Sequence, residues 1–256
     1  MNKLESLPII VLSLMVVCVL CFAIVAVYFL LLKDDAAEPV NEETEAAVLN
    51  VAGLANNGHR DEQTLRALFE ARIVTRQLNL DRGELVPAGQ TGEEHQRCAD
   101  LPPNRDPAQI RRRCALVDIY LVRDTDQRIQ QIILPVYGKG AKSMMYALVA
   151  LRTDGRTVND LIYYQQNETP LLGARVEDPQ WRRQWAGKKI RDEHGRPALQ
   201  VVQDNTGQHD AYTVDGISGA TLTSTGVEKS INFWMGEQGY ANFLRHLQDN
   251  PAILTQ

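Results

Sequence analysis

The densest group of potentially reactive side chains lies between residues 215 and 227, where hydroxyl residues follow small ones. Gly216, Gly219 and Ala220 carry little or no side chain, so another molecule can approach the backbone closely there. Threonine or serine then occupies four of the next five positions, which are residues 221, 223, 224 and 225. A run of this kind can hold an anion, or can offer a hydroxyl oxygen for covalent attachment.

A helix is predicted directly after this segment, over residues 227–235, because apolar side chains recur there at helical spacing. Thr225 and Glu228 fit the capping box that begins many helices. The hydroxyl-rich loop would then lie at a helix N-terminus, where unpaired N–H groups and the helix dipole favour an anion, typically a phosphate. An ordinary turn followed by a capped helix explains the same residues, so composition and spacing leave both interpretations open.

An antiparallel sheet is expected to position this segment. Apolar runs predict strands at residues 115–122, 128–137, 144–151 and 158–164, and Asp154-Gly155 is a strong turn signal between the last two. A further strand is expected at residues 199–203, and a long loop at residues 86–113. Helices are expected at residues 42–54, 61–73, 179–188 and 240–247. The predicted fold class is therefore α+β, an antiparallel sheet with packed helices in one domain.

The N-terminal part has a different character, because residues 7–32 contain no charged side chain. A helix of about 20 or more apolar residues spans a bilayer, and no small-residue cleavage site follows this run. The sequence predicts a single uncleaved transmembrane helix at residues 7–32. Lys3 favours residues 1–6 in the cytoplasm. Residues 33–60 would then form a linker and helix, and residues 61–256 a domain outside the cytoplasmic membrane.

Two pairs of cysteines have different expected roles. Cys18 and Cys21 lie within the apolar run, where cysteine behaves as a small apolar residue. Cys98 and Cys114 lie in the exported part, where a disulfide is permitted. The sequence leaves open whether this second pair is bonded or free.

Composition excludes several classes of protein. Among 256 residues, 44% are hydrophobic and 23% charged, which excludes a disordered chain and a membrane protein with many spans. The net charge of −5, without a basic stripe, argues against a nucleic-acid partner. The five histidines show no metal-ligand spacing, and no G-x-G-x-x-G follows a strand, so neither a metal nor NADH is expected here. No catalytic acid, base or nucleophile is expected either.

Residues 218–221 read Ser-Gly-Ala-Thr, follow Asp-Gly and precede Leu-Thr-Ser. This segment resembles the flavinylation motif of the FMN-binding domain family. In that family a flavin transferase moves FMN from FAD onto the threonine that ends the motif, through a phosphoester. The resemblance implies covalent FMN on Thr221, with Thr223 as the alternative attachment residue. It also implies that the flavin is bound by Asp215, Ser218, Gly219 and Ala220.

A second motif is the Glu-Thr-Pro sequence at residues 168–170, followed by Leu172 and Gly173. In the family these positions help to hold the flavin, so Glu168, Thr169, Leu172 and Gly173 are expected contacts. A rigid turn after a strand is the alternative interpretation. The chain departs from the family pattern at Leu171, where glycine is usual, and at Lys142, where tryptophan is common. A cation at residue 142 would stabilise an anionic reduced flavin.

Three further segments, at residues 143–147, 181–185 and 233–236, resemble one branch of the family in order and spacing. That branch consists of flavin subunits of the sodium-translocating NADH:quinone oxidoreductase in the bacterial inner membrane. The resemblance implies an electron carrier between an iron–sulfur centre and another subunit's flavin, in a complex that reduces ubiquinone and exports sodium. The flavin subunit of the related ferredoxin–NAD oxidoreductase is one alternative. A membrane-anchored scaffold without redox activity is another.

Overall fold

The computed structural model describes residues 15, 42–55, 61–86, 98–203 and 210–255. The chain divides into two compact units, residues 1–41 and 42–256, and the fold given below is that of the second unit. Apart from Met15, the predicted span at residues 7–32 lies outside the described residues, as do residues 1–6 and both cysteines of the first pair. Within the described part of the chain, no helix is long and apolar enough to cross a bilayer.

A six-stranded antiparallel sheet forms the centre of the unit, in the order β2-β1-β5-β6-β7-β8. The four long strands predicted from apolar runs are confirmed, each within two residues at either end. Gly155, in the predicted Asp-Gly turn, has a φ of +64°, the backbone conformation that glycine adopts easily. The strands are β1 (Ile73–Asn79), β2 (Glu84–Leu85), β5 (Leu116–Arg123), β6 (Ile129–Lys139), β7 (Met144–Arg152) and β8 (Val158–Gln165).

Strand β1 was not predicted. Helix α3 (Glu62–Arg72) ends where expected, and the backbone becomes extended at Ile73. Ile73 fits the apolar stripe of the helix in sequence, but in the structure it begins a strand that pairs with β5 along its full length. The β-branched Val74 and Thr75 favour this extended conformation.

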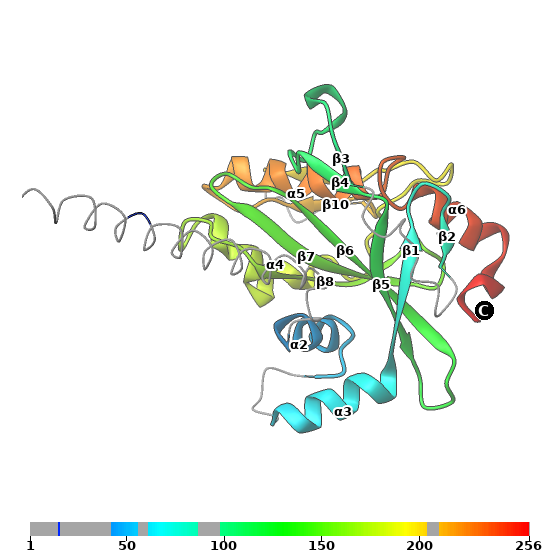
Figure 1. The fold of residues 1–256 in the computed structure, drawn as a ribbon. Coiled ribbons are helices and arrows are strands. Elements are labelled where there is room, and N and C mark those ends of the chain that lie inside the picture. The colour runs from blue at the N-terminus through cyan, green and yellow to red at the C-terminus, as the bar shows by residue number, and fades with distance from the viewer. Residues whose placement is uncertain (1–14, 16–41, 56–60, 87–97, 204–209, 256) are drawn as a thin grey trace, which may run out of the picture. The chain divides into compact units, whose positions relative to one another are not determined.

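Helices cover both faces of the sheet, as Figure 1 shows. Successive residues of a strand point to opposite faces, so Ile119 and Leu121 belong to one core cluster while Tyr120 and Val122 belong to another. Helix α2 (Glu42–Val51) and α3 pack on the second cluster. Helices α5 (Thr221–Trp234) and α6 (Ala241–Asp249) pack on the first. The α+β fold class is therefore confirmed.

Helix α5 begins well before the predicted position, so the capping box of Thr225 and Glu228 is wrong. The first backbone bond of the helix runs from the Ser224 N–H to the Ala220 carbonyl, and Glu228 accepts the N–H of Val201 on strand β9 (Gln200–Val202) instead. Gly226, which resembles a helix breaker in sequence, lies inside the helix. A Cβ at this position would collide with the Lys139 carbonyl oxygen, so glycine lets α5 approach β6.

The segment predicted as a loop at residues 86–113 contains regular structure in its described part. Strands β3 (Cys98–Asp100) and β4 (Arg112–Cys114) form a short hairpin around the 3₁₀ helix η2 (Pro103–Arg105). Cys98 and Cys114 are directly opposite each other in this hairpin and form a disulfide. The bond closes the long connection that the sequence left undecided.

The remaining elements lie around the N-terminus of α5 and after α6. They are the 3₁₀ helix η3 (Gly173–Glu177), helix α4 (Pro179–Arg183), strand β10 (Thr213–Asp215), which is parallel to β9, and the C-terminal 3₁₀ helix η4 (Pro251–Thr255). Helix α4 is shorter than predicted. Trp181 and Trp185 are nevertheless both buried, with ring centroids 5.4 Å apart, as their spacing indicated.

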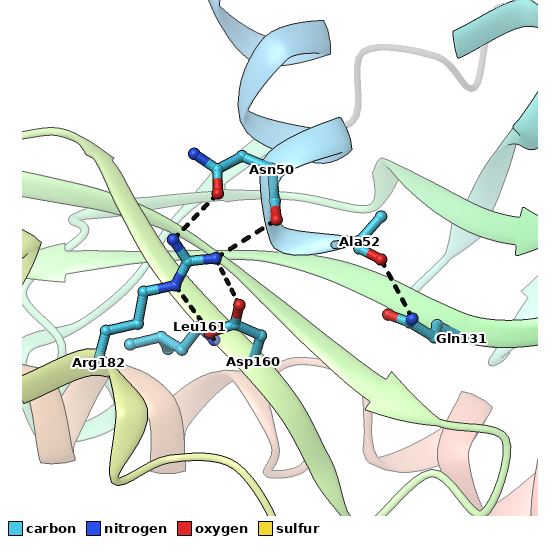
Figure 2. A network of polar contacts seen from close by, with 6 residues as sticks. All are labelled: Asn50, Ala52, Gln131, Asp160, Leu161 and Arg182. Carbon is cyan, nitrogen blue, oxygen red and sulfur yellow. Dashed lines mark hydrogen bonds and ion pairs between the residues drawn. The ribbon is translucent and has the colours of Figure 1, made fainter. Parts of the chain in front are cut away.

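A polar network joins α4 to the sheet and to α2, as Figure 2 shows. Arg182 donates to both carboxylate oxygens of Asp160 on β8, with Nε 2.8 Å from Oδ1. Its Nη1 also donates to Asn50 Oδ1 at the end of α2, at 3.0 Å. Beside it, Gln131 Nε2 donates to the Ala52 carbonyl at 3.3 Å. One guanidinium therefore fixes three elements relative to one another.

Replacing Arg182 with alanine is expected to destabilise the unit by about 2 kcal/mol, because Asp160 would be left without its bidentate partner in a partly buried site. For a domain of this size the midpoint of thermal unfolding would fall by roughly 4–8 °C. Calorimetry of the variant measures the change. Arg183→Ala is the matched control, because Arg183 is exposed on the same helix. Equal melting temperatures for the two variants would show that the network adds no stability.

Candidate functional site

Thr221 is the first residue of α5 and is exposed. The N-cap residue, Ala220, provides no side-chain hydrogen bond to the helix. The first N–H groups of a helix have no partner within it. A 14-residue helix therefore presents uncapped backbone donors directly beside an exposed hydroxyl group.

The turn before Thr221 is held from within the helix. Ser224 is fully buried, and its Oγ accepts the Ile217 N–H at 2.9 Å. Gly219 has a φ of +78°, in the left-handed region that favours glycine. Ser218 and Gly219 are exposed, whereas Ala220 is buried. The predicted motif therefore forms a tight turn whose exposed residues lead directly to Thr221.

Asp215 lies farther back, at the end of β10, and its backbone is held by α4 and the residue after it. The indole Nε1 of Trp181 donates to the Asp215 carbonyl at 2.8 Å, and the Gln184 amide both donates to that carbonyl and accepts the Asp215 N–H. A pocket of about 380 Å³ opens between these elements. Its lining includes Trp181, Gln184, Asp215, Ser218 and Arg175.

Glu168 is buried and accepts hydrogen bonds from five donors. Its Oε1 accepts the backbone N–H groups of Lys142 at 2.9 Å and Ser143 at 2.8 Å, and also the Ser143 hydroxyl. Its Oε2 accepts the Ala141 N–H at 3.0 Å and the Thr223 hydroxyl at 2.7 Å. This carboxylate therefore joins the loop after β6 to the first turn of α5.

The environment of Glu168 keeps it ionised. Burial alone would raise its pKa, but the hydrogen bonds from the Thr223 hydroxyl and the three backbone N–H groups outweigh that effect. The pKa of Glu168 is therefore below its ordinary value. The carboxylate is a charged structural anchor, and its hydrogen-bonding capacity is used inside the protein.

The two threonines considered for flavin attachment lie in opposite environments. Thr223 is only 1% exposed, and its hydroxyl is committed to Glu168. Thr221, two positions earlier in the same helical turn, is exposed. A transferase that must bring a second molecule to a hydroxyl oxygen can reach Thr221 without opening the fold.

The loop after Glu168 packs against the turn before Thr221. A Cβ on Gly173 would lie 2.6 Å from Thr223 Oγ1, so only glycine fits there. The Leu172 side chain lies beside Gly219, with its Cδ2 3.2 Å from the position of a Cβ on that residue. Thr169 is exposed, and its carbonyl accepts the Leu172 N–H at 3.2 Å. The rigid turn and the candidate site are therefore one feature.

The structure thus brings together Glu168, Thr169, Leu172 and Gly173 with the turn at residues 218–221, and places Asp215 at the edge of the group. The residues that hold the site together were missed as such. Thr223, Ser224, Gln184 and Ser143 act through contacts between separate segments, which have no local signal in the sequence.

The donors at this site fit a phosphoryl group. An oxygen-linked phosphate on Thr221 would lie at the positive end of α5, where the unpaired N–H groups of the first turn are directed at it. Gly219 leaves the approach open, and the negative charge of the buried Glu168 is offset by its own donors. The residues present therefore suit an anionic group attached through the threonine oxygen.

Comparison with known proteins identifies related chains. Residues 140–236, which contain every element of this site, match the model of the FMN-binding domain. The NqrC protein of Yersinia pestis, named for the Na(+)-translocating NADH-quinone reductase, is 42% identical over 91% of this chain and 90% of its own. The protein of the same name from Vibrio alginolyticus is 39% identical over 90% of both chains.

Solved structures agree with these sequence matches. The crystal structure of Shewanella oneidensis NqrC has a TM-score of 0.72 and 30% identity, and the match covers 82% of this chain and 98% of that one. The corresponding structure from Parabacteroides distasonis, at 22% identity and a TM-score of 0.58, shares the fold. Identity above 30% over nine-tenths of the chain establishes that this protein belongs to the NqrC family of the Na⁺-translocating NADH-quinone reductase.

Proposed function

We propose that this chain is the covalent-FMN, electron-carrying subunit of a Na⁺-translocating NADH:ubiquinone oxidoreductase. The observation that carries the proposal is the exposed Thr221 hydroxyl at the uncapped N-terminus of α5, inside the segment that matches the FMN-binding domain. Bound FMN supplies one- and two-electron redox chemistry, and the protein positions it. The names of the relatives support the assignment to this complex.

Thr221 Oγ1 would receive the FMN phosphoryl group from FAD, with a flavin transferase as the catalyst. The new phosphoester bond forms as the pyrophosphate bond of FAD breaks, AMP leaves, and the hydroxyl proton is released. The N–H groups of the first turn of α5 would then hold the phosphate oxygens. Ser218, Gly219 and Ala220 shape the approach, and Leu172 lies beside it.

Within the complex the chain would pass electrons from an iron–sulfur centre to another subunit's flavin, while the complex as a whole exports sodium. It would itself bind neither NADH nor quinone. Lys142 is exposed, and its backbone N–H is held by Glu168, so a cation stands on the loop beside the attachment site. Its charge would favour a reduced, anionic flavin.

The chain would be anchored in a bacterial inner membrane by residues 7–32, with residues 1–6 in the cytoplasm. Residues 33–60 would form the linker and helix, and residues 61–256 the periplasmic FMN-binding domain. The uncharged run supports the span. The disulfide between Cys98 and Cys114 supports an oxidising compartment for the domain.

Intact-mass spectrometry of the chain, co-expressed with a flavin transferase, tests the proposal. We expect an added mass equal to FMN less one water, and a fluorescent protein band on a denaturing gel under ultraviolet light. The chain expressed without the transferase is the control and should run colourless. A colourless band and an unmodified mass in the presence of an active transferase would instead favour a scaffold without redox activity.

A further inference from the structure

Three large hydrophobic side chains are exposed in the described part of the unit at residues 42–255, and all three lie at the candidate site. Leu171 is 87% exposed, Leu222 71% and Leu172 42%. Isolated exposed leucines are ordinary on a protein surface, but a group that gathers around one feature indicates a binding surface. Here the feature is the Thr221 hydroxyl.

Leu171 also has an unfavourable backbone. Its φ of +63° lies in the left-handed region, which is rare and strained for a bulky residue. The turn around it is held by the Thr169 carbonyl, which accepts the N–H groups of Leu172 and Ala174 at 3.2 Å. Strained residues of this kind cluster at functional sites, where the surrounding structure maintains them. Strain and exposure thus occur in one side chain beside the site.

The leucines lie within reach of a group attached to Thr221. Leu222 is its neighbour in the helix, and Leu172 contacts Gly219, two residues before it. Two residues span at most about 7 Å of chain. Eight single bonds separate the threonine oxygen from the ring system of an attached FMN, which gives a reach of about 10 Å. The ring can therefore arrive at these side chains.

We propose that Leu171, together with Leu222, covers the isoalloxazine ring of the attached FMN and shields it from water. The inference rests on the proposed function and assigns the cofactor-facing role to side chains that are otherwise exposed. An aromatic ring system presents two wide apolar faces. Covering such a face with leucine side chains removes apolar surface of both groups from water.

The pocket beside Asp215 is the other place for the ring, and it is less suitable. The Trp181 and Gln184 donors that line it are already bonded to Asp215, and Arg175 lies 3.9 Å from the Asp178 carboxylate. These groups hold the loop and offer few directed bonds to a new ligand. Leu171 and Leu222, in contrast, expose most of their surface, so a ring can cover them without displacing another group.

Iodide quenching of flavin fluorescence in the native, flavinylated protein tests the inference. Leu171→Gly and Leu171→Asn remove the apolar side chain but keep residues that tolerate a positive φ, so the turn should remain intact. We expect the quenching constant to rise about twofold in both variants, because one of the two ring faces becomes accessible. Circular dichroism and the intact mass verify that each variant is folded and carries FMN.

Arg175→Ala is the matched control, since it alters the pocket and leaves the leucines in place. It should leave the quenching constant at the wild-type value. Unchanged quenching in both Leu171 variants with FMN attached would overturn this inference alone, and a rise with Arg175→Ala would place the ring in the pocket. Absence of FMN from the wild-type chain would instead contradict the proposed function, which the intact mass detects separately.

Discussion

A Thr221→Val chain, co-expressed with a flavin transferase, is expected to carry no covalent flavin. Valine keeps the shape of threonine but lacks the oxygen that would form the phosphoester. The neighbouring hydroxyls do not replace it, because Thr223 and Ser224 are buried and bonded within the protein. In-gel fluorescence should disappear completely, and the intact mass should equal that of the unmodified chain.

The loss would not arise from unfolding. Thr221 is exposed, and exposed substitutions usually change the free energy of unfolding by less than about 0.5 kcal/mol. Thr225→Val is the matched control, because it removes another exposed hydroxyl four residues farther along α5 and should keep full fluorescence. Fluorescence that persisted in Thr221→Val would move the attachment to Thr223 or to another residue.

Thr223 and Thr221 illustrate what the sequence could and could not provide. Both stand in one short hydroxyl run, and only the resemblance to the flavinylation motif ranked one above the other. Their difference comes from Glu168, 55 positions before Thr223, whose carboxylate binds the second hydroxyl. A contact between segments so far apart leaves no periodicity or spacing to detect.

The predicted elements show the same division. Strands β5 to β8 have one or both faces in a core, and this burial appears directly as apolar runs. The start of α5 was misplaced because Thr225, Gly226 and Glu228 resemble a helix beginning. Gly226 is instead required by the approach of α5 to the Lys139 carbonyl, and Glu228 by its bond to Val201. Tertiary contacts decided these residues, so local rules failed in the region where the site is assembled.

Glu168→Gln is expected to destabilise the protein by about 3 kcal/mol at neutral pH. Five donors converge on the two carboxylate oxygens, and glutamine would replace one acceptor oxygen with an NH₂ donor. At least one buried N–H or hydroxyl would lose its partner and meet another donor. The midpoint of thermal unfolding should fall by roughly 6–12 °C. Glu193→Gln, at an exposed glutamate, is the matched control.

The difference between wild type and Glu168→Gln should also depend on pH, with a sign that follows from the lowered pKa of Glu168. A carboxyl group with a lower pKa in the folded state binds fewer protons there than in the unfolded chain. Its stabilisation is complete above the unfolded pKa, near 4.5, and is lost as the pH falls through the folded value. Urea unfolding should therefore give a constant difference from pH 7 to about pH 5.5 and a shrinking one below about pH 4.5. A difference that stayed constant into acid would show that the charge of Glu168 contributes nothing, and that shape alone places the loop at residues 141–143 against α5.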